Sequence, residues 1–285
     1  MTSRSTFVTA GLAAALAGAL TACAPADPGP AATPNACTKA NLTTKSAGKL
    51  TIGTDDPAYE PWVRGNKPEN GEGFESAVAY AVANRLGYAK DDVVWIRVTF
   101  NNAIAPGPKQ YDFDINQFSI TEERKQAVDF SSPYYDVRQT VIATKSSKIA
   151  GVKTLAELKD AKLGAQVGTT SYQAITDVIK PSGQPSVYNS NDDAKKALQN
   201  GQIDGLVVDL PTAFYITSAE LQDAKIVGQL PPGTGTPEQF GAVLDKGSAL
   251  TTCVSQAVEK LRSAGTLATL EKQWLSTAGS APELT

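Results

Sequence analysis

The residues best suited to hold a small charged molecule are an arginine and an aspartate that lie far apart in the chain. Arg124 stands in INQFSITEERKQAVDFSSPYY, just after an apolar stretch, and Asp209 ends the apolar stretch of IDGLVVD. A planar guanidinium can grip a carboxylate through two parallel hydrogen bonds. A zwitterion carries one charge of each sign, and a buried charge without a partner is costly. Arg124 and Asp209 together therefore suit the two ends of a zwitterion.

The residues around Arg124 predict the start of a helix. Ser119 and Glu122 fit the capping-box pattern S-x-x-E, and Thr121 offers a second cap. A helix that begins here directs unpaired backbone N–H groups and the positive end of its dipole toward an anion. The alternative is a capped surface helix with one solvated arginine.

The elements that must position these groups alternate between strand and helix, which predicts an α/β fold. Strands are expected at residues 50–54, 93–100, 112–120, 162–168, 203–209 and 239–246. Helices are expected at 73–87, 154–160, 171–179, 191–200, 210–219, 248–265 and 266–275. Because the last strand runs back to the first set, we expect two lobes joined by two crossing strands. Their predicted bounds are 49–141 plus 241–277 for lobe 1 and 142–240 for lobe 2.

The N-terminal residues 1–22 read as a signal peptide. Arg4 is followed by an uncharged run over 7–20, which is shorter than the about 20 residues that span a bilayer. The run ends in Leu-Thr-Ala-Cys, which resembles the lipobox of bacterial lipoproteins and implies an acylated Cys23. The alternative is a plain signal peptide with an incidental cysteine. We read residues 23–48 as a lipidated N-terminus and flexible spacer, rich in proline and alanine up to residue 36.

Composition excludes several classes of function. The chain has no histidine, so a serine triad of the usual kind or a zinc site is not expected, and we predict no metal and no cofactor. Its formal charge is −3, which gives no support to nucleic-acid binding. After signal removal Cys37 and Cys253 remain. A leftover pair in an oxidising compartment predicts a disulfide, worth roughly 4 kcal/mol in the chain-entropy model.

The stretch FSITEERKQAVDFSSPYYD resembles the signature of the family 3 extracellular solute-binding proteins, the polar amino-acid receptors of ABC importers. The family form is an apolar strand, then S-I-T-x-x-R, then D-F-S-x-P-Y-Y. The resemblance extends from about Lys49 to Leu275 and takes in LTIGTD, GFESAVAYAVANRLG, VGTTSY, GQIDGLVVD and GTLATLEKQWL. It implies a type II periplasmic-binding-protein-like fold, with two α/β lobes that close on a ligand without making or breaking a bond.

The resemblance also implies roles for individual residues. Arg124 would clamp the ligand α-carboxylate, and Ser119 would contact the ligand's main-chain groups. Gln117 lies where the family offers a polar or carbonyl contact to the ammonium. Asp209 would take the α-ammonium, although its place before Leu210 also suits a helix N-cap.

Further ligand contacts are implied in both lobes. The turn after a lobe 2 strand would supply backbone N–H groups to the carboxylate, at Gly168, Thr169 and Thr170. Tyr59 and Phe100 would cover the ligand side chain. The alternatives are an ordinary strand-to-helix turn and two packing residues.

The first ligand loop, TDDPAYEPWVRGNKPENGEG, departs from the common family form by an extra residue before Tyr59. It carries Asp55, which we include among the ligand-binding residues, together with Asp56 and Glu60. An acidic cluster favours a cationic ligand such as arginine or lysine. Arg64 or Arg138 would invert that preference, so the sequence leaves the ligand open.

We interpret the chain as an extracytoplasmic, lipid-anchored and monomeric receptor that presents a free polar amino acid to ABC permease subunits. Two alternatives use the same scaffold. One is a dehydratase-like enzyme acting on small carboxylates, with Glu60 or Glu75 as general acid. The other is a ligand-sensing protein.

Overall fold

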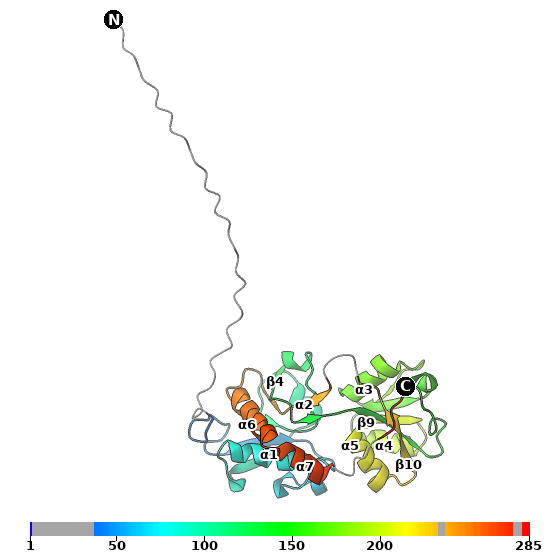
Figure 1. Ribbon diagram of the computed structural model, residues 1–285, viewed down its shortest axis with the longest axis horizontal. Coiled ribbons are helices and arrows are strands. Elements are labelled where there is room, and N and C mark those ends of the chain that lie inside the picture. Colours follow the sequence, from blue (N-terminus) through cyan, green and yellow to red (C-terminus); the bar gives the residue numbers. More distant parts are fainter. Residues whose placement is uncertain (2–36, 233–236, 276–280) are drawn as a thin grey trace. The chain divides into compact units, whose positions relative to one another are not determined.

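Two separate five-stranded sheets organise the chain (Figure 1). The computed structural model describes Met1 and residues 37–232, 237–275 and 281–285. The described residues from Cys37 onward belong to one compact unit. The predicted signal peptide and Cys23 lie outside the described residues, as does the spacer up to residue 36.

Lobe 1 is built on the sheet β2-β1-β3-β12-β4. Strand β1 is parallel to β2 and β3, whereas β12 is antiparallel to β3 and β4. The bounds are Leu50–Thr54 for β1, Val93–Arg97 for β2, Phe113–Asp114 for β3, Val128–Phe130 for β4 and Val243–Asp245 for β12.

Lobe 2 is built on the sheet β10-β6-β9-β7-β8. Strand β9 is parallel to β7 and antiparallel to β6. The bounds are Gln139–Thr144 for β6, Leu163–Gln166 for β7, Ser186–Tyr188 for β8, Gly205–Asp209 for β9 and Ala224–Gln229 for β10. The last five residues also pack on lobe 2, where Leu284 is buried among apolar side chains.

The chain crosses twice between the lobes. Strand β5 (Tyr135–Asp136) leads from lobe 1 to lobe 2, and β11 (Gln239–Phe240) leads back. These two short strands pair antiparallel, so the predicted pair of crossing strands is present. The predicted division between residues 141 and 142 falls inside β6, which pairs only within the lobe 2 sheet.

Helices cover both sheets. The bounds are Phe74–Arg85 for α1, Phe100–Ile104 for α2, Thr170–Ala174 for α3, Asn191–Gln199 for α4, Leu210–Tyr215 for α5, Thr251–Ser263 for α6 and Thr266–Trp274 for α7. Short 3-10 turns occupy Arg64–Asn66, Pro68–Asn70, Lys90–Asp92, Arg124–Gln126 and Leu155–Leu158. π-helical turns extend α3 over Ile175–Ile179 and α5 over Ile216–Glu220.

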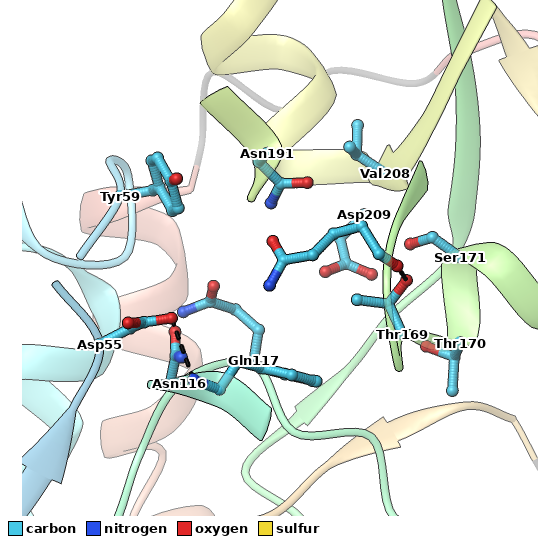
Figure 2. A pocket seen from close by; sticks show the side chains of 12 residues that line it. Asp55, Tyr59, Asn116, Gln117, Thr169, Thr170, Ser171, Asn191, Val208 and Asp209 are labelled. Carbon is cyan, nitrogen blue, oxygen red and sulfur yellow. Dashed lines mark hydrogen bonds between the residues drawn. The ribbon is translucent and has the colours of Figure 1, made fainter. Parts of the chain in front are cut away.

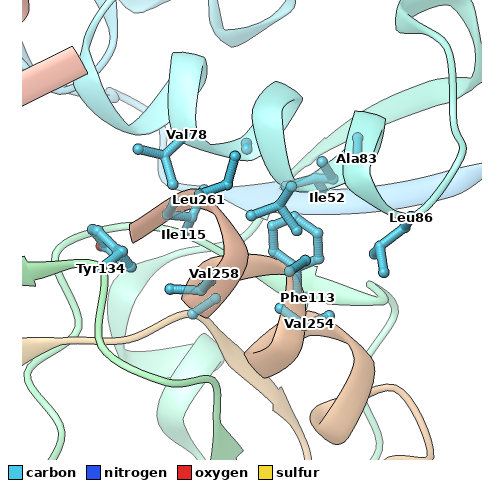
Figure 3. Packing of buried hydrophobic residues seen from close by; sticks show 14 of the residues in the cluster. Ile52, Val78, Ala83, Leu86, Phe113, Ile115, Tyr134, Val254, Val258 and Leu261 are labelled. Atoms are coloured by element: carbon cyan, nitrogen blue, oxygen red, sulfur yellow. The ribbon is translucent and has the colours of Figure 1, made fainter. Parts of the chain in front are cut away.

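The core of lobe 1 lies between its sheet and helices α1 and α6 (Figure 3). Val78 and Val82 lie four residues apart on one face of α1, which is the spacing of a buried helical stripe. The Cys37–Cys253 disulfide, predicted from the sequence, is confirmed and ties the first described segment to α6.

Lobe 2 buries both faces of its sheet. Along β6, Val141 and Ala143 belong to one apolar cluster and Ile142 to the other. Successive side chains of a strand point to opposite faces, so the continuous apolar run of β6 indicates a strand covered on both sides.

The prediction of a helix at Ser119 is wrong. Only one 3-10 turn forms there, at Arg124–Gln126, and Ser119 lies in an extended bridge to Phe240. Thr121 is not the N-cap residue of this turn, which is Glu123 and makes no side-chain cap bond, but its Oγ1 accepts from the Arg124 backbone N–H at 3.2 Å. The expected strand over 112–120 shortens to β3, since Gln117 takes a left-handed backbone conformation with φ of 48°.

Candidate functional site

A polar cavity between the lobes gathers most of the predicted ligand-binding residues (Figure 2). Seven of the nine line it, namely Asp55, Tyr59, Phe100, Gln117, Thr169, Thr170 and Asp209. Ser119 and Arg124 lie beside it. The other lining residues are Asn116, Gln166, Ser171, Asn191 and Val208, none of which the sequence singled out.

Hydrogen bonds between described residues of the two lobes surround this cavity. Trp62 Nε1 donates to Thr212 Oγ1 at 2.9 Å, and Arg124 Nη2 donates to the Gly168 carbonyl at 2.8 Å. The hydroxyls of Ser119 and Thr170 lie 3.1 Å apart. Each bond joins one group from each lobe, so the set holds the lobes together in this arrangement.

Arg124 is buried, with an exposed fraction of 8%. Its Nη1 donates to the Ser119 carbonyl at 2.7 Å, and the guanidinium carbon lies 5.3 Å from the centre of the Phe100 ring. Burial lowers the pKa of Arg124, but a guanidinium stays charged in proteins. Phe100 stacks on Phe118 at 5.0 Å, so it both packs and lines the cavity.

Asp209 closes β9 and occupies the N-cap position of α5 without capping it. Its Oδ1 instead accepts a hydrogen bond from Gln139 Nε2 at 2.8 Å. Burial, and next the charge of Glu238, raise the pKa of Asp209 well above its ordinary value. A bound cation would favour the ionised form, which is the behaviour expected of an ammonium receptor.

The turn after β7 needs a glycine. Gly168 has φ of 74°, and a Cβ there would lie 2.7 Å from Asn101 Oδ1. The hydroxyl of Thr169 accepts from the Tyr172 backbone N–H and donates to the Gln166 carbonyl. The side chain of Thr169 therefore caps α3.

Gln117 is held by a buried glutamate. Glu75 accepts hydrogen bonds from the Gln117 backbone N–H at 2.7 Å, from the Gln117 side-chain amide and from the Tyr134 hydroxyl. Burial raises the pKa of Glu75 to about 7. These three bonds fix the left-handed residue that faces the ligand cavity.

Asp55 brings a carboxylate to the lobe 1 wall of the cavity. It accepts from the backbone N–H groups of Asp56 and Phe100, and burial raises its pKa. The arginines that could reverse the ligand preference lie elsewhere. Arg64 is 3.7 Å from Glu72, and Arg138 is 2.7 Å from Glu283.

Gln139 and Glu238, which were not predicted from the sequence, form hydrogen bonds with the predicted site residues. Gln139, at the start of β6, donates to both Asp209 and Glu238. Glu238, just before β11, accepts from Ser119 Oγ at 2.6 Å. Nothing in the local sequence marks either residue, since each acts only after the crossing strands bring it beside both lobes.

No group of three or more His, Cys, Asp or Glu among the described residues is arranged to hold a metal ion. Within the same residues no helix is long and apolar enough to cross a membrane.

Comparison with known proteins gives a consistent result. The model of the bacterial extracellular solute-binding proteins, family 3, matches residues 50–277. The ABC transporter glutamine-binding protein GlnH of Bacillus subtilis is 30% identical over 213 residues, which cover 73% of this chain and 75% of the relative.

Two solved structures are similar throughout the lobes. An ancestral arginine-binding protein bound to arginine has a TM-score of 0.64 at 28% identity, covering 80% of this chain and 98% of its own. The ancestral amino acid-binding protein AncCDT-1, a precursor of cyclohexadienyl dehydratase, has a TM-score of 0.65 at 29% identity, covering 80% and 95%.

Proposed function

The chain belongs to the bacterial extracellular solute-binding proteins of family 3, and from that premise we propose that it captures a free polar amino acid for an ABC importer. The ligand lies between the lobes. Arg124 and Ser119 take its α-carboxylate, and Asp209 takes its α-ammonium. The relatives named above bind glutamine and arginine, which places polar amino acids first among the candidates.

The single observation that carries this proposal is that two opposite charges, one from each lobe, meet at one cavity, which Asp209 lines and Arg124 lies beside. Arg124 reaches across from lobe 1 to the Gly168 turn, and Asp209 lies at the end of a lobe 2 strand. A zwitterion held by both residues bridges the lobes and stabilises the closed form. The ligand supplies the counter-charge that each buried group needs.

Asp55 favours a ligand whose side chain is cationic. Among the described residues no lysine or arginine forms an ion pair with its carboxylate within 4.0 Å. Phe100 and Tyr59 flank the same wall and offer apolar surface to the aliphatic part of such a side chain. Arginine and lysine are therefore the first ligands to test.

The proposed membrane anchoring and the proposed permease partners are inferred from the sequence. Signal-peptide cleavage before Cys23 and its acylation would tether the protein outside the cell, where the permease subunits meet it. Two or more acyl chains hold a protein stably at a membrane. The receptor acts as a monomer. Its lobes follow the predicted bounds of 49–141 plus 241–277 and 142–240, except that all of β6, from Gln139, belongs to lobe 2.

The enzymatic alternative has one supporting feature, the pKa of about 7 at Glu75. However, Glu75 does not line the cavity, and its oxygens already accept from Gln117 and Tyr134. A general acid must reach the substrate atom that it protonates. We assign Glu75 to positioning Gln117.

A calorimetric screen of the purified protein against the twenty amino acids tests the proposal. At least one should bind with a dissociation constant of about 10 μM or less, or roughly −7 kcal/mol. Absence of heat with all twenty would refute it. Turnover of a small carboxylate without amino-acid binding would favour the enzyme instead.

A further inference from the structure

Glu238 adds a third carboxylate to the site, after Asp55 and Asp209. It lies on the side where Ser119 and Arg124 would bind the carboxylate of the ligand. It belongs to the segment that crosses back to lobe 1, one residue before β11. Its Oε1 accepts from Ser119 Oγ at 2.6 Å, and both of its oxygens lie 3.1 Å from Gln139 Nε2. It therefore contacts a lobe 1 ligand residue and the first residue of the lobe 2 strand β6 together.

The contact with Ser119 uses the only hydrogen that this hydroxyl can donate. A serine hydroxyl has one O–H donor and two acceptor positions. With its hydrogen on Glu238, Ser119 can accept from the Thr170 hydroxyl 3.1 Å away but cannot donate to a second carboxylate. A ligand carboxylate and Glu238 thus need the same hydrogen.

The negative charge of Glu238 also opposes binding of the ligand carboxylate. Glu238 is the acidic residue whose charge influences Arg124 most, ahead of Asp209. A carboxylate near Arg124 weakens the pull of the guanidinium on a second carboxylate. The Gln139 amide bridges Glu238 and Asp209, so both acids draw on one neutral donor group.

We propose that Glu238 is an internal competitor of the ligand carboxylate, which occupies Ser119 and offsets Arg124 until the ligand displaces it. This inference rests on the proposed function, because it takes Arg124 and Ser119 as the carboxylate receptors. Glu238 therefore lowers the affinity for a ligand with a carboxylate, because that carboxylate must replace the one of Glu238 at Ser119.

The experiment compares wild type with Glu238→Gln, which keeps size and an acceptor oxygen but removes the charge. The matched control is Glu122→Gln, which removes the same charge from a side chain that is 88% exposed and whose one ion pair among the described residues is with Lys125. The probes are the twenty L-amino acids, followed by the carboxamide of the tightest binder. Thermal unfolding checks each variant, and Glu238→Ala replaces E238Q if that variant lacks a cooperative transition.

E238Q should bind the amino acid about tenfold more tightly than wild type, while E122Q should not differ from wild type. The ratio of amino-acid to carboxamide affinity should rise, because only the amino acid competes with Glu238. Unchanged or weaker binding by E238Q would overturn the inference, as would equal tightening of both probes. If neither wild type nor E238Q binds any amino acid, the proposed function itself fails.

Discussion

The guanidinium of Arg124 in lobe 1 donates to the backbone carbonyl of Gly168 in lobe 2, and the atoms are 2.8 Å apart. The same side chain donates to the Ser119 carbonyl at 2.7 Å. The predicted carboxylate clamp is thus oriented by one neighbour from each lobe. Its remaining donors are the ones that a ligand carboxylate would use.

Replacing Arg124 with lysine should separate charge from geometry. Lysine keeps the positive charge but loses the planar fork that can serve two carbonyls and a carboxylate together. We expect affinity for the best amino-acid ligand to fall at least about 100-fold, which equals about 2.7 kcal/mol. Isothermal titration measures the loss. Affinity equal to that of wild type would place the carboxylate receptor elsewhere.

Asp209→Asn should weaken binding through the other end of the ligand. The amide can still accept a hydrogen bond but offers no charge to the ammonium, so a loss of about tenfold or more is expected. Asp223→Asn is a suitable control, since the side chain of Asp223 does not line the cavity. Retention of full affinity in D209N would argue against an ammonium contact.

Glu75 makes stability depend on pH. Its pKa is about 7 in the folded protein against an ordinary value of 4.5, so the folded state binds the extra proton between these values. Stability should therefore fall as pH rises from about 4.5 through 7, by up to about 3 kcal/mol.

Glu75→Gln removes this dependence, because an amide can pair with Gln117 and Tyr134 without ionising. Relative to wild type, E75Q should gain in unfolding midpoint at pH 8 and lose most of that gain at pH 5. Denaturant titrations at both values provide the measurement. A difference between the two proteins that is independent of pH would show that Glu75 does not titrate in this range.

Removing the disulfide should lower stability without changing the ligand site. Cys37 and Cys253 lie outside the cavity lining, and their link closes a loop with a sequence separation of 216. The double variant Cys37→Ser, Cys253→Ser should lose about 5 kcal/mol of unfolding free energy and keep its ligand affinity. An unaltered urea midpoint would mean that the link adds nothing to stability.

The sequence predicted the order of elements because each leaves a local pattern. Val78 and Val82 repeat at helical spacing, and residues 205–208 of β9 are a continuous apolar run. The helix predicted at Ser119 does not form, and the reason is physical. Its pattern S-x-x-E satisfies a helix cap, but pairing with Phe240 holds the backbone extended and turns the hydroxyl toward Thr170.

Site residues could be predicted where they belong to a local sequence motif. Residues that belong only to a long-range hydrogen-bond network could not. Arg124 and Asp209 lie at the ends of apolar stretches, so their position and charge predict that they bind a ligand. Glu238 and Gln139 contribute through contacts with residues more than 60 positions away, such as Gln139 with Asp209 and Ser119 with Glu238. Pairing of β6 with β9 sets Gln139 opposite Asp209, and the return segment before β11 brings Glu238 to Ser119.

The most direct measurement compares the tightest amino-acid ligand with two analogues, its carboxamide and its N-acetyl derivative. One lacks the negative end and the other the positive end. If Arg124 and Asp209 hold opposite ends of a zwitterion, each analogue should bind wild type at least about 100-fold more weakly than the parent. Parent-like affinity of either analogue would contradict this account, because one of the two charges would then have no partner in the ligand.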